Sequence, residues 1–146
     1  MMNQEEIINS QTSADVHNML ADSGYSEKAI GYYLEKPYMG TIPEADQISQ
    51  MVGSCGDTMG VYLKVKQGII TDARYEVLGC PGAIASAMAA VDLIKGKSLE
   101  YAREIDDNDI FKVLEHIPAK KHHCIQLAVK TLRKAIDEYE MTNMKQ

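Results

Sequence analysis

The stretch that decides the fold runs from Thr58 to Leu78 and reads TMGVYLKVKQGIITDARYEVL. Apolar residues alternate with polar ones in both of its halves, first at Val61, Leu63 and Val65 and then at Ala73, Tyr75 and Val77. A period of two is typical of a strand with one buried face. Gln67-Gly68 lies between the halves and predicts the turn of a hairpin. Both strands would therefore be covered by helices on one side only.

Helical patterns follow the hairpin. The segment from Ala83 to Ile94 is apolar nearly all round and predicts a buried central helix that stops at Gly96. Ser98, and then Asp106 or Asp107, are the expected N-caps of two short helices before Pro118. A last helix is predicted from about Lys121 to Tyr139, with an apolar stripe of Ile125, Ala128, Val129, Leu132 and Ile136.

A shorter helix is predicted before the hairpin. Ser26 is its expected N-cap and Leu34 its end, and its apolar side would consist of Ala29, Ile30, Tyr33 and Leu34. Residues 1–24 contain four acidic residues and no basic one, which indicates an acidic arm that is either mobile or marginally helical. Residues 25–146 would form one domain. Helix, hairpin and further helices in this order predict the α+β class.

Composition excludes two classes of partner. The chain has 146 residues, 45% of them hydrophobic and 25% charged, a balance typical of one globular domain. Its 15 basic and 21 acidic residues give a net charge of -6, which argues against binding to a nucleic-acid backbone. No apolar run approaches the roughly 18 residues of a membrane helix, and the first 24 residues lack the basic start of a signal peptide. We therefore expect a cytoplasmic protein with neither nucleic acid nor membrane as a partner.

Three cysteines carry the chemistry that the sequence suggests. Cys55 lies in a glycine-rich loop before the first strand, whereas Cys80 and Cys124 lie where helices begin. A helix N-terminus favours the thiolate, so a low thiol pKa is expected for Cys80 and Cys124. An odd number of cysteines without a secretory signal favours metal or thiolate chemistry over disulfides.

The spacing of these cysteines is itself a weak signal, because it matches no paired C-x-x-C motif. Their placement is stronger, since the two hairpin ends are neighbours and the last helix could bring Cys124 to them. Asp57 or His123 could supply a fourth ligand. A buried structural cysteine is the plainer alternative, and it weighs most for Cys80. His122 would point about 100° away from His123 on a helix, so the two would not share a metal.

Several motifs together resemble one family. From about Tyr25 to Tyr139, the chain is similar to the iron-sulfur cluster assembly scaffolds of the IscU and NifU N-terminal type. The resemblance is carried by Tyr25-Ser26-Glu27-Lys28, Cys55-Gly56-Asp57, Asp72-Ala73-Arg74-Tyr75, Gly79-Cys80, Ala83-Ile84-Ala85-Ser86, Lys95-Gly96-Lys97-Ser98-Leu99 and His123-Cys124. It implies a three-stranded antiparallel sheet backed by helices on one face, with a third strand near Ile48 to Val52.

The resemblance also implies a function. It implies a scaffold rather than an enzyme. Such a scaffold takes persulfide sulfur from a cysteine desulfurase, combines it with iron into a labile 2Fe-2S cluster and passes the cluster to apo acceptor proteins. Cys55, Cys80 and Cys124 would be the thiolate ligands, with Cys124 as the persulfide acceptor. Asp57 and His123 would complete the ligand set, Asp57 keeping the cluster releasable, and zinc would bind at the same place in the apo form. An electron donor and an iron donor are further candidate partners, and a partly exposed cluster could be shared with a second copy of the chain in a homo-oligomer.

The chain departs from the family pattern at two places, and the first is Pro81, which follows the second cysteine where many members have Gly or Ala. Ile117-Pro118-Ala119-Lys120-Lys121 stands where many members have Leu-Pro-Pro-Val-Lys, which weakens the expectation of a DnaK-type chaperone as a partner. Cys80 and Cys124 are 44 positions apart, which leaves no room for the insertion of the related SufU type, a zinc-bound persulfide acceptor. The scaffold is thus the leading hypothesis. A SufU-like zinc-dependent sulfurtransferase is the alternative, and a structural zinc module is a third.

Overall fold

The alternating stretch forms the hairpin that the sequence predicts. In the computed structural model, which describes residues 4–144, strands β2 (Thr58–Lys66) and β3 (Ile69–Leu78) pair antiparallel, with Val61 opposite Tyr75. Gln67 and Gly68 both have positive φ, 53° and 77°, as a two-residue type I′ turn requires. Strand β1 (Gln47–Val52) pairs antiparallel with β2 and confirms the expected third strand. The sheet order is β1-β2-β3.

An irregularity in the hairpin adjusts its buried face. The register shifts between Lys64 and Val65, so that Ile70 pairs with Val65 while Ala73 pairs with Leu63. Ile70 and Ala73 are three positions apart, yet both are fully buried. A β-bulge permits this, because one extra residue restores the next side chain to the same face.

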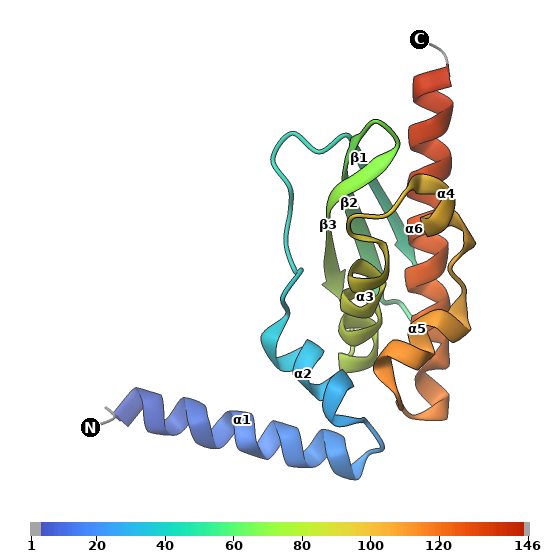
Figure 1. Ribbon diagram of the computed structural model, residues 1–146. Helices are drawn as coiled ribbons and strands as arrows, with labels where there is room; N and C mark the ends of the chain where they lie inside the picture. Colours follow the sequence, from blue (N-terminus) through green and yellow to red (C-terminus); the bar gives the residue numbers. More distant parts are fainter. Residues whose placement is uncertain (1–3, 145–146) are drawn as a thin grey trace.

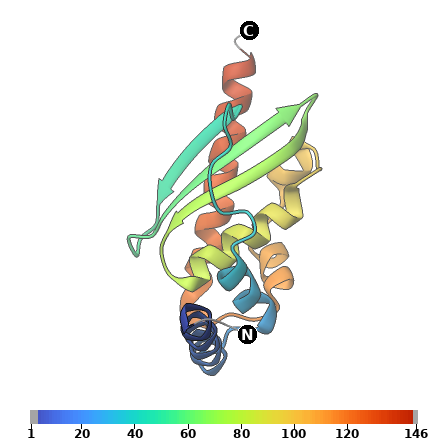
Figure 2. The ribbon, with the colours of Figure 1, turned by 90° about the vertical axis from the view of Figure 1, so that its left-hand side faces the viewer.

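Helices cover one face of the sheet, as predicted (Figure 1). Helix α3 (Pro81–Ile94) contacts β3, and helix α6 (His122–Met144) contacts β1 and β2. Figure 2 shows residues 36–46 on the opposite side of the sheet. The start of this segment also pairs with the outer edge of β3. Gly40 N–H donates to the Tyr75 carbonyl, and Tyr75 N–H donates to the Tyr38 carbonyl.

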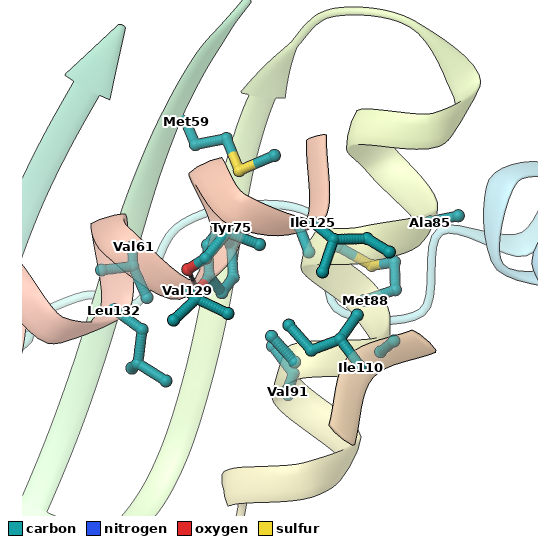
Figure 3. Close-up of a cluster of buried hydrophobic side chains, with 14 of the residues drawn as sticks. Met59, Val61, Tyr75, Ala85, Met88, Val91, Ile110, Ile125, Val129 and Leu132 are labelled. Carbon is teal, nitrogen blue, oxygen red and sulfur yellow. Dashed lines mark hydrogen bonds between the residues drawn. The ribbon is translucent and has the colours of Figure 1, made fainter. Parts of the chain in front are cut away.

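The core lies between the sheet and these helices (Figure 3). Tyr75 is fully buried and its hydroxyl donates to the Ala128 carbonyl at 3.0 Å. Helix α3 is buried along almost its whole length, as its sequence predicts. The buried side chains drawn around Tyr75 include Met59, Val61, Met88, Val91, Ile110, Ile125, Val129 and Leu132.

The remaining helices begin where capping predicts. Helix α2 (Glu27–Glu35) starts after Ser26, whose hydroxyl accepts from Ala29 N–H at 3.0 Å. Ser98 caps α4 (Leu99–Glu104), and Asp106 forms a capping box at the start of α5 (Asp107–Leu114). These N-caps confirm the sequence prediction.

Three details of the helices differ from prediction. Helix α3 begins at Pro81 instead of Ala83, because Cys80 acts as the N-cap and proline suits the first helical position. Helix α6 begins after a 3-10 turn at Ala119–Lys121 and continues to Met144. Helix α2 buries Tyr32 instead of Leu34, which is 38% exposed. Tyr32 is turned inwards because its hydroxyl donates to Asp92 on α3.

The acidic arm forms helix α1 (Gln4–Asp22), which extends away from the sheet (Figure 1). Its C-terminal end packs on α2: Leu20 is buried, and His17 Nε2 lies 2.7 Å from Glu27 Oε2. Residues 1–3 of the arm lie outside the described residues. Within residues 4–144, none of the helices combines the length and apolar character needed to span a membrane.

Candidate metal centre

Three chain segments meet at the open end of the hairpin. The first is the loop of residues 53–57, which turns sharply before β2. Gly53 N–H donates to the Asp57 carbonyl at 2.7 Å, and Gly56 N–H donates to the Gly53 carbonyl at 3.0 Å. Gly56 has φ of 90°, a conformation that favours glycine. This turn places Cys55 at an exposed tip and Asp57 at the foot of the strand.

The second segment is the end of β3. Thr58 pairs with Leu78, so the residues that flank this pair, Asp57 and Gly79, are neighbours by register. Cys80 follows as the N-cap of α3, where its carbonyl accepts from the N–H groups of Ala83 and Ile84. Its thiol is half-buried. The hairpin therefore brings Asp57 and Cys80 together without help from any other element.

The third segment is the first turn of α6, which carries His123 and Cys124. Cys124 is fully buried, and its Sγ lies 3.5 Å from Cys80 Sγ. Asp57 Oδ2 lies 3.6 Å from Cys80 Sγ and 3.9 Å from Cys124 Sγ. His123 Nε2 lies 3.6 Å from Cys124 Sγ. Helix α6 thus supplies the contacts that the hairpin cannot.

The candidate ligand atoms form two triads that share Asp57. Cys55, Asp57 and His123 form an outer triad, and Asp57, Cys80 and Cys124 form an inner one. Within each triad the ligand atoms lie within 4.8 Å of one another. Two thiolates bound at about 2.3 Å to a tetrahedral metal lie about 3.8 Å apart. The inner triad, with separations of 3.5 to 3.9 Å, therefore has the spacing of a metal-binding set.

The two inner thiols differ in acidity. The pKa of Cys80 falls to about 6, mainly because its sulfur accepts a hydrogen bond from Cys124 and further because Ala83 N–H at the start of α3 stabilises the thiolate. The pKa of Cys124 is raised, since its thiol donates that hydrogen bond and is buried. The low pKa predicted for Cys80 is confirmed in direction, whereas the low pKa predicted for Cys124 is wrong. The hydrogen bond between the two thiols couples their titrations, so the position of Cys124 at a helix start does not set its pKa alone.

The structure places every predicted site residue at this end of the molecule. Cys55 joins the outer triad and does not belong to the inner one. His122 packs its ring against Phe111, with the ring centroids 5.2 Å apart, and takes part in neither triad. This confirms the prediction that His122 and His123 face different ways.

Tyr25 and Lys121 are neighbours of the thiols that the sequence analysis did not place at the site. Tyr25 is buried, and burial together with the charges of Cys80 and Cys124 raises the pKa of its hydroxyl to about 12. The cation of Lys121 contributes to lowering the pKa of Cys80. Tyr25 belongs to the quoted motif Tyr25-Ser26-Glu27-Lys28, but only the capping role of Ser26 could be inferred from the local pattern.

Comparison with known proteins identifies the family. The NifU-like N-terminal domain matches residues 24–146. The chain belongs to this family. The iron-sulfur cluster assembly scaffold protein IscU of Escherichia coli is 41% identical over 121 residues, covering 80% of this chain and 94% of that protein. An IscU scaffold protein of Archaeoglobus fulgidus is 37% identical over 123 residues, covering 83% of this chain and 80% of that protein.

Solved structures of the family share the fold. A putative iron-sulfur cluster assembly scaffold protein for the SUF system from Fervidobacterium islandicum has a TM-score of 0.64 and 26% identity, covering 77% of this chain and 96% of that chain. The N-terminal part of a nitrogen-fixing NifU-like protein from Brucella abortus has a TM-score of 0.65 at 23% identity, covering 80% of this chain and 94% of that chain. These neighbours confirm the α+β class with a three-stranded antiparallel sheet.

Proposed function

We propose that this protein is an assembly scaffold for iron-sulfur clusters, and specifically for a labile 2Fe-2S cluster. The observation that carries the proposal is the convergence of Cys80, Cys124 and Asp57 from separate elements, with Cys55 and His123 beside them. Thiolates suit iron-sulfide chemistry. The names of the IscU relatives, which describe assembly scaffold proteins, support the same function.

The five residues would divide the work. Cys55, Cys80 and Cys124 would supply thiolates to the cluster, and either Asp57 or His123 would complete the set. A carboxylate oxygen is a harder ligand than a thiolate and a poorer partner for an iron-sulfide unit. Because Asp57 belongs to both triads, it would loosen the cluster at its centre and keep it transferable.

Sulfur delivery would use the contact between the two inner thiols. We assign the persulfide to Cys124, which attacks the terminal sulfur of a desulfurase persulfide and releases the desulfurase cysteine as a thiolate. The Cys124 proton would pass to the thiolate of Cys80, whose sulfur lies 3.5 Å away and already accepts the hydrogen bond from Cys124. Cys124 is fully buried, so the delivering partner would have to open the loop of residues 53–57 or the first turn of α6.

The partners follow from this chemistry. A cysteine desulfurase would supply sulfur, an iron donor and an electron donor would supply the other components, and apo iron-sulfur proteins would receive the cluster. We propose that residues 25–146 hold the scaffold and that α1 is a separate acidic arm. A homo-oligomer that shares an exposed cluster is compatible with this arrangement.

A zinc-bound persulfide relay is the second candidate. The inner triad has the spacing of tetrahedral zinc, and a SUF-system protein is among the structural neighbours. Such a protein would stimulate desulfurase turnover with zinc bound and build no cluster. A third hypothesis, a structural zinc module, predicts that chelating the metal unfolds the chain.

Anaerobic reconstitution separates these candidates. The protein and its Cys124→Ser variant would be incubated with iron, cysteine and a cysteine desulfurase, and then analysed by visible absorption and for iron and sulfide. The scaffold predicts a cluster spectrum that is lost or short-lived in the variant. Zinc retained throughout, without sulfide, would support the relay instead. Asp57→Ala should lengthen the lifetime of the cluster, and a shorter lifetime would contradict the role assigned to Asp57.

A further inference from the structure

Gly79 and Asp57 are in unusually close contact at the site. A Cβ atom added to Gly79 would lie 2.8 Å from Asp57 Cγ, 3.0 Å from Oδ1 and 3.1 Å from Cβ. Real side chains do not approach so closely, so either Asp57 or the backbone would have to move. Gly79 is not among the glycines with positive φ. The backbone conformation of Gly79 would therefore accept an alanine. A glycine is needed here because there is no room for a Cβ atom beside Asp57.

The carboxylate that touches Gly79 is the one that faces the thiols. Asp57 Oδ1 lies on the Gly79 side, while Oδ2 lies 3.6 Å from Cys80 Sγ and 3.9 Å from Cys124 Sγ. The two oxygens move together because the carboxylate is rigid. Rotating the short Asp57 side chain away from a Cβ at position 79 would therefore withdraw Oδ2 from both sulfurs.

Two other glycines near the site also have close neighbours, but these neighbours are not candidate metal ligands. A Cβ at Gly53 would meet the end of the Leu127 side chain at 3.0 Å, and a Cβ at Gly82 would meet Lys121 Cβ at 3.2 Å. Neither neighbour is a candidate ligand. Among the close contacts that the glycines of residues 4–144 would make through an added Cβ, the one at Gly79 is with the side chain shared by both triads.

We propose that Gly79 is a positioning residue for Asp57. Its missing side chain leaves the space in which the Asp57 carboxylate reaches the inner thiols, and so it sets how firmly bound metal or cluster is held. For the cluster, this inference rests on the proposed scaffold function. For a single metal ion, it rests only on the geometry of the triads.

A double-mutant cycle tests the inference with Co²⁺ as the probe. Gly79→Ala, Asp57→Ala and the double variant would be compared with the parent for Co²⁺ affinity and for the visible spectrum of the complex, which reports its ligands. We expect Gly79→Ala to weaken binding and change the spectrum as Asp57→Ala does. In the Asp57→Ala background, Gly79→Ala should then have no further effect, because it acts through the carboxylate.

Gly31→Ala is the matched control, since a Cβ on Gly31 of α2 meets nothing within 4 Å. It should leave the Co²⁺ complex unchanged. Thermal unfolding of the metal-free variants separates positioning from folding, because a merely structural role would lower the midpoint in both backgrounds. If Gly79→Ala does not fold, the double variant should fold, since most of the clash is gone. A double variant that also fails to fold would contradict the proposal.

Two further results would overturn the inference: a parent-like Co²⁺ spectrum in Gly79→Ala, or an equal effect of Gly79→Ala with and without Asp57. After reconstitution, the cluster in Gly79→Ala should also outlive the parent cluster by the same factor as in Asp57→Ala. If the parent forms no cluster at all, the proposed function fails. The Co²⁺ cycle still decides the role of Gly79 in that case.

Discussion

The two ends of the β2–β3 hairpin are built differently. At the closed end, Gln67 and Gly68 make a two-residue turn whose conformation is set by their own backbone angles, and both are exposed. At the open end, the strands separate beyond the Thr58–Leu78 pair, and Asp57 and Cys80 meet a helix that begins more than forty residues later. The turn conformation at the closed end is thus specified locally, although the Gly68 carbonyl also accepts from Leu99 N–H, whereas the complete site at the open end depends on the packing of α6. The two ends should therefore respond differently to substitution, with metal binding most sensitive at the open end.

Cys80→Ser should abolish metal and cluster retention at the open end. Even a residue that only orients a metal ligand commonly costs about 10- to 100-fold in affinity, and removing a thiolate should cost more. Co²⁺ titration and sulfide analysis would measure the loss. The unfolding midpoint of the metal-free variant should stay close to that of the parent, because the thiol is only half-buried. A large drop in that midpoint would mean that Cys80 is mainly a structural residue.

Leu63→Ala should have the largest effect on stability along the hairpin. Leu63 is fully buried between the sheet and the helices, and removing such a side chain costs about 2–5 kcal/mol in free energy of unfolding. Denaturant unfolding would measure this. Below the unfolding transition, Co²⁺ affinity should match the parent, since Leu63 lies far along β2 from Asp57. Weakened metal binding in the folded variant would show that the two ends are coupled.

Labelling of the metal-free protein should distinguish the two inner thiols. Cys80 has a pKa of about 6 and Cys124 a raised one, so an alkylating reagent at pH 7 should modify Cys80 before Cys124. The thiolate is the reactive form. The rate at Cys80 should therefore be flat above its pKa and fall about tenfold per pH unit below it. Mass spectrometry of the labelled peptides gives the site, and preferential labelling of Cys124 would reverse the assignment.

Gly68→Ala should destabilise the closed end only slightly. Gly68 has φ of 77°, and a Cβ there meets nothing within 4 Å, so strain of the backbone is the only cost. A residue with a side chain in this region costs about 1–2 kcal/mol. Denaturant unfolding should show this decrease with Co²⁺ binding unchanged. A change in metal binding would contradict the independence of the two ends.

The sequence predicted the parts of the fold that short-range physics controls. Alternation from Thr58 to Leu78 sets the hairpin and its buried face, and Ser26, Ser98 and Asp106 set the starts of three helices. Such signals involve residues only a few positions apart. These local signals do not predict the β-bulge, in which Thr71 is the extra residue. A bulge is recognised only when the pairing of both strands is known.

The candidate site was predicted less completely. The identities of Cys55, Asp57, Cys80, His123 and Cys124 came from the residues and from the family resemblance. Their division into two triads, the raised pKa of Cys124 and the contact of Asp57 with Gly79 were not predicted. Each of these depends on distances between segments that are far apart in the chain.

By itself, the sequence determined the two hairpin strands, the capped starts of three helices and the set of residues able to bind a metal, since periodicity, capping and side-chain chemistry are local properties. Only the tertiary structure decided which of these residues meet. Packing of α6 against the sheet places Cys124 3.5 Å from Cys80, and that contact makes one thiol acidic and leaves the proton on the other. Proximity of this kind changes chemistry because hydrogen bonds and charges act over a few ångströms, whatever the separation along the chain.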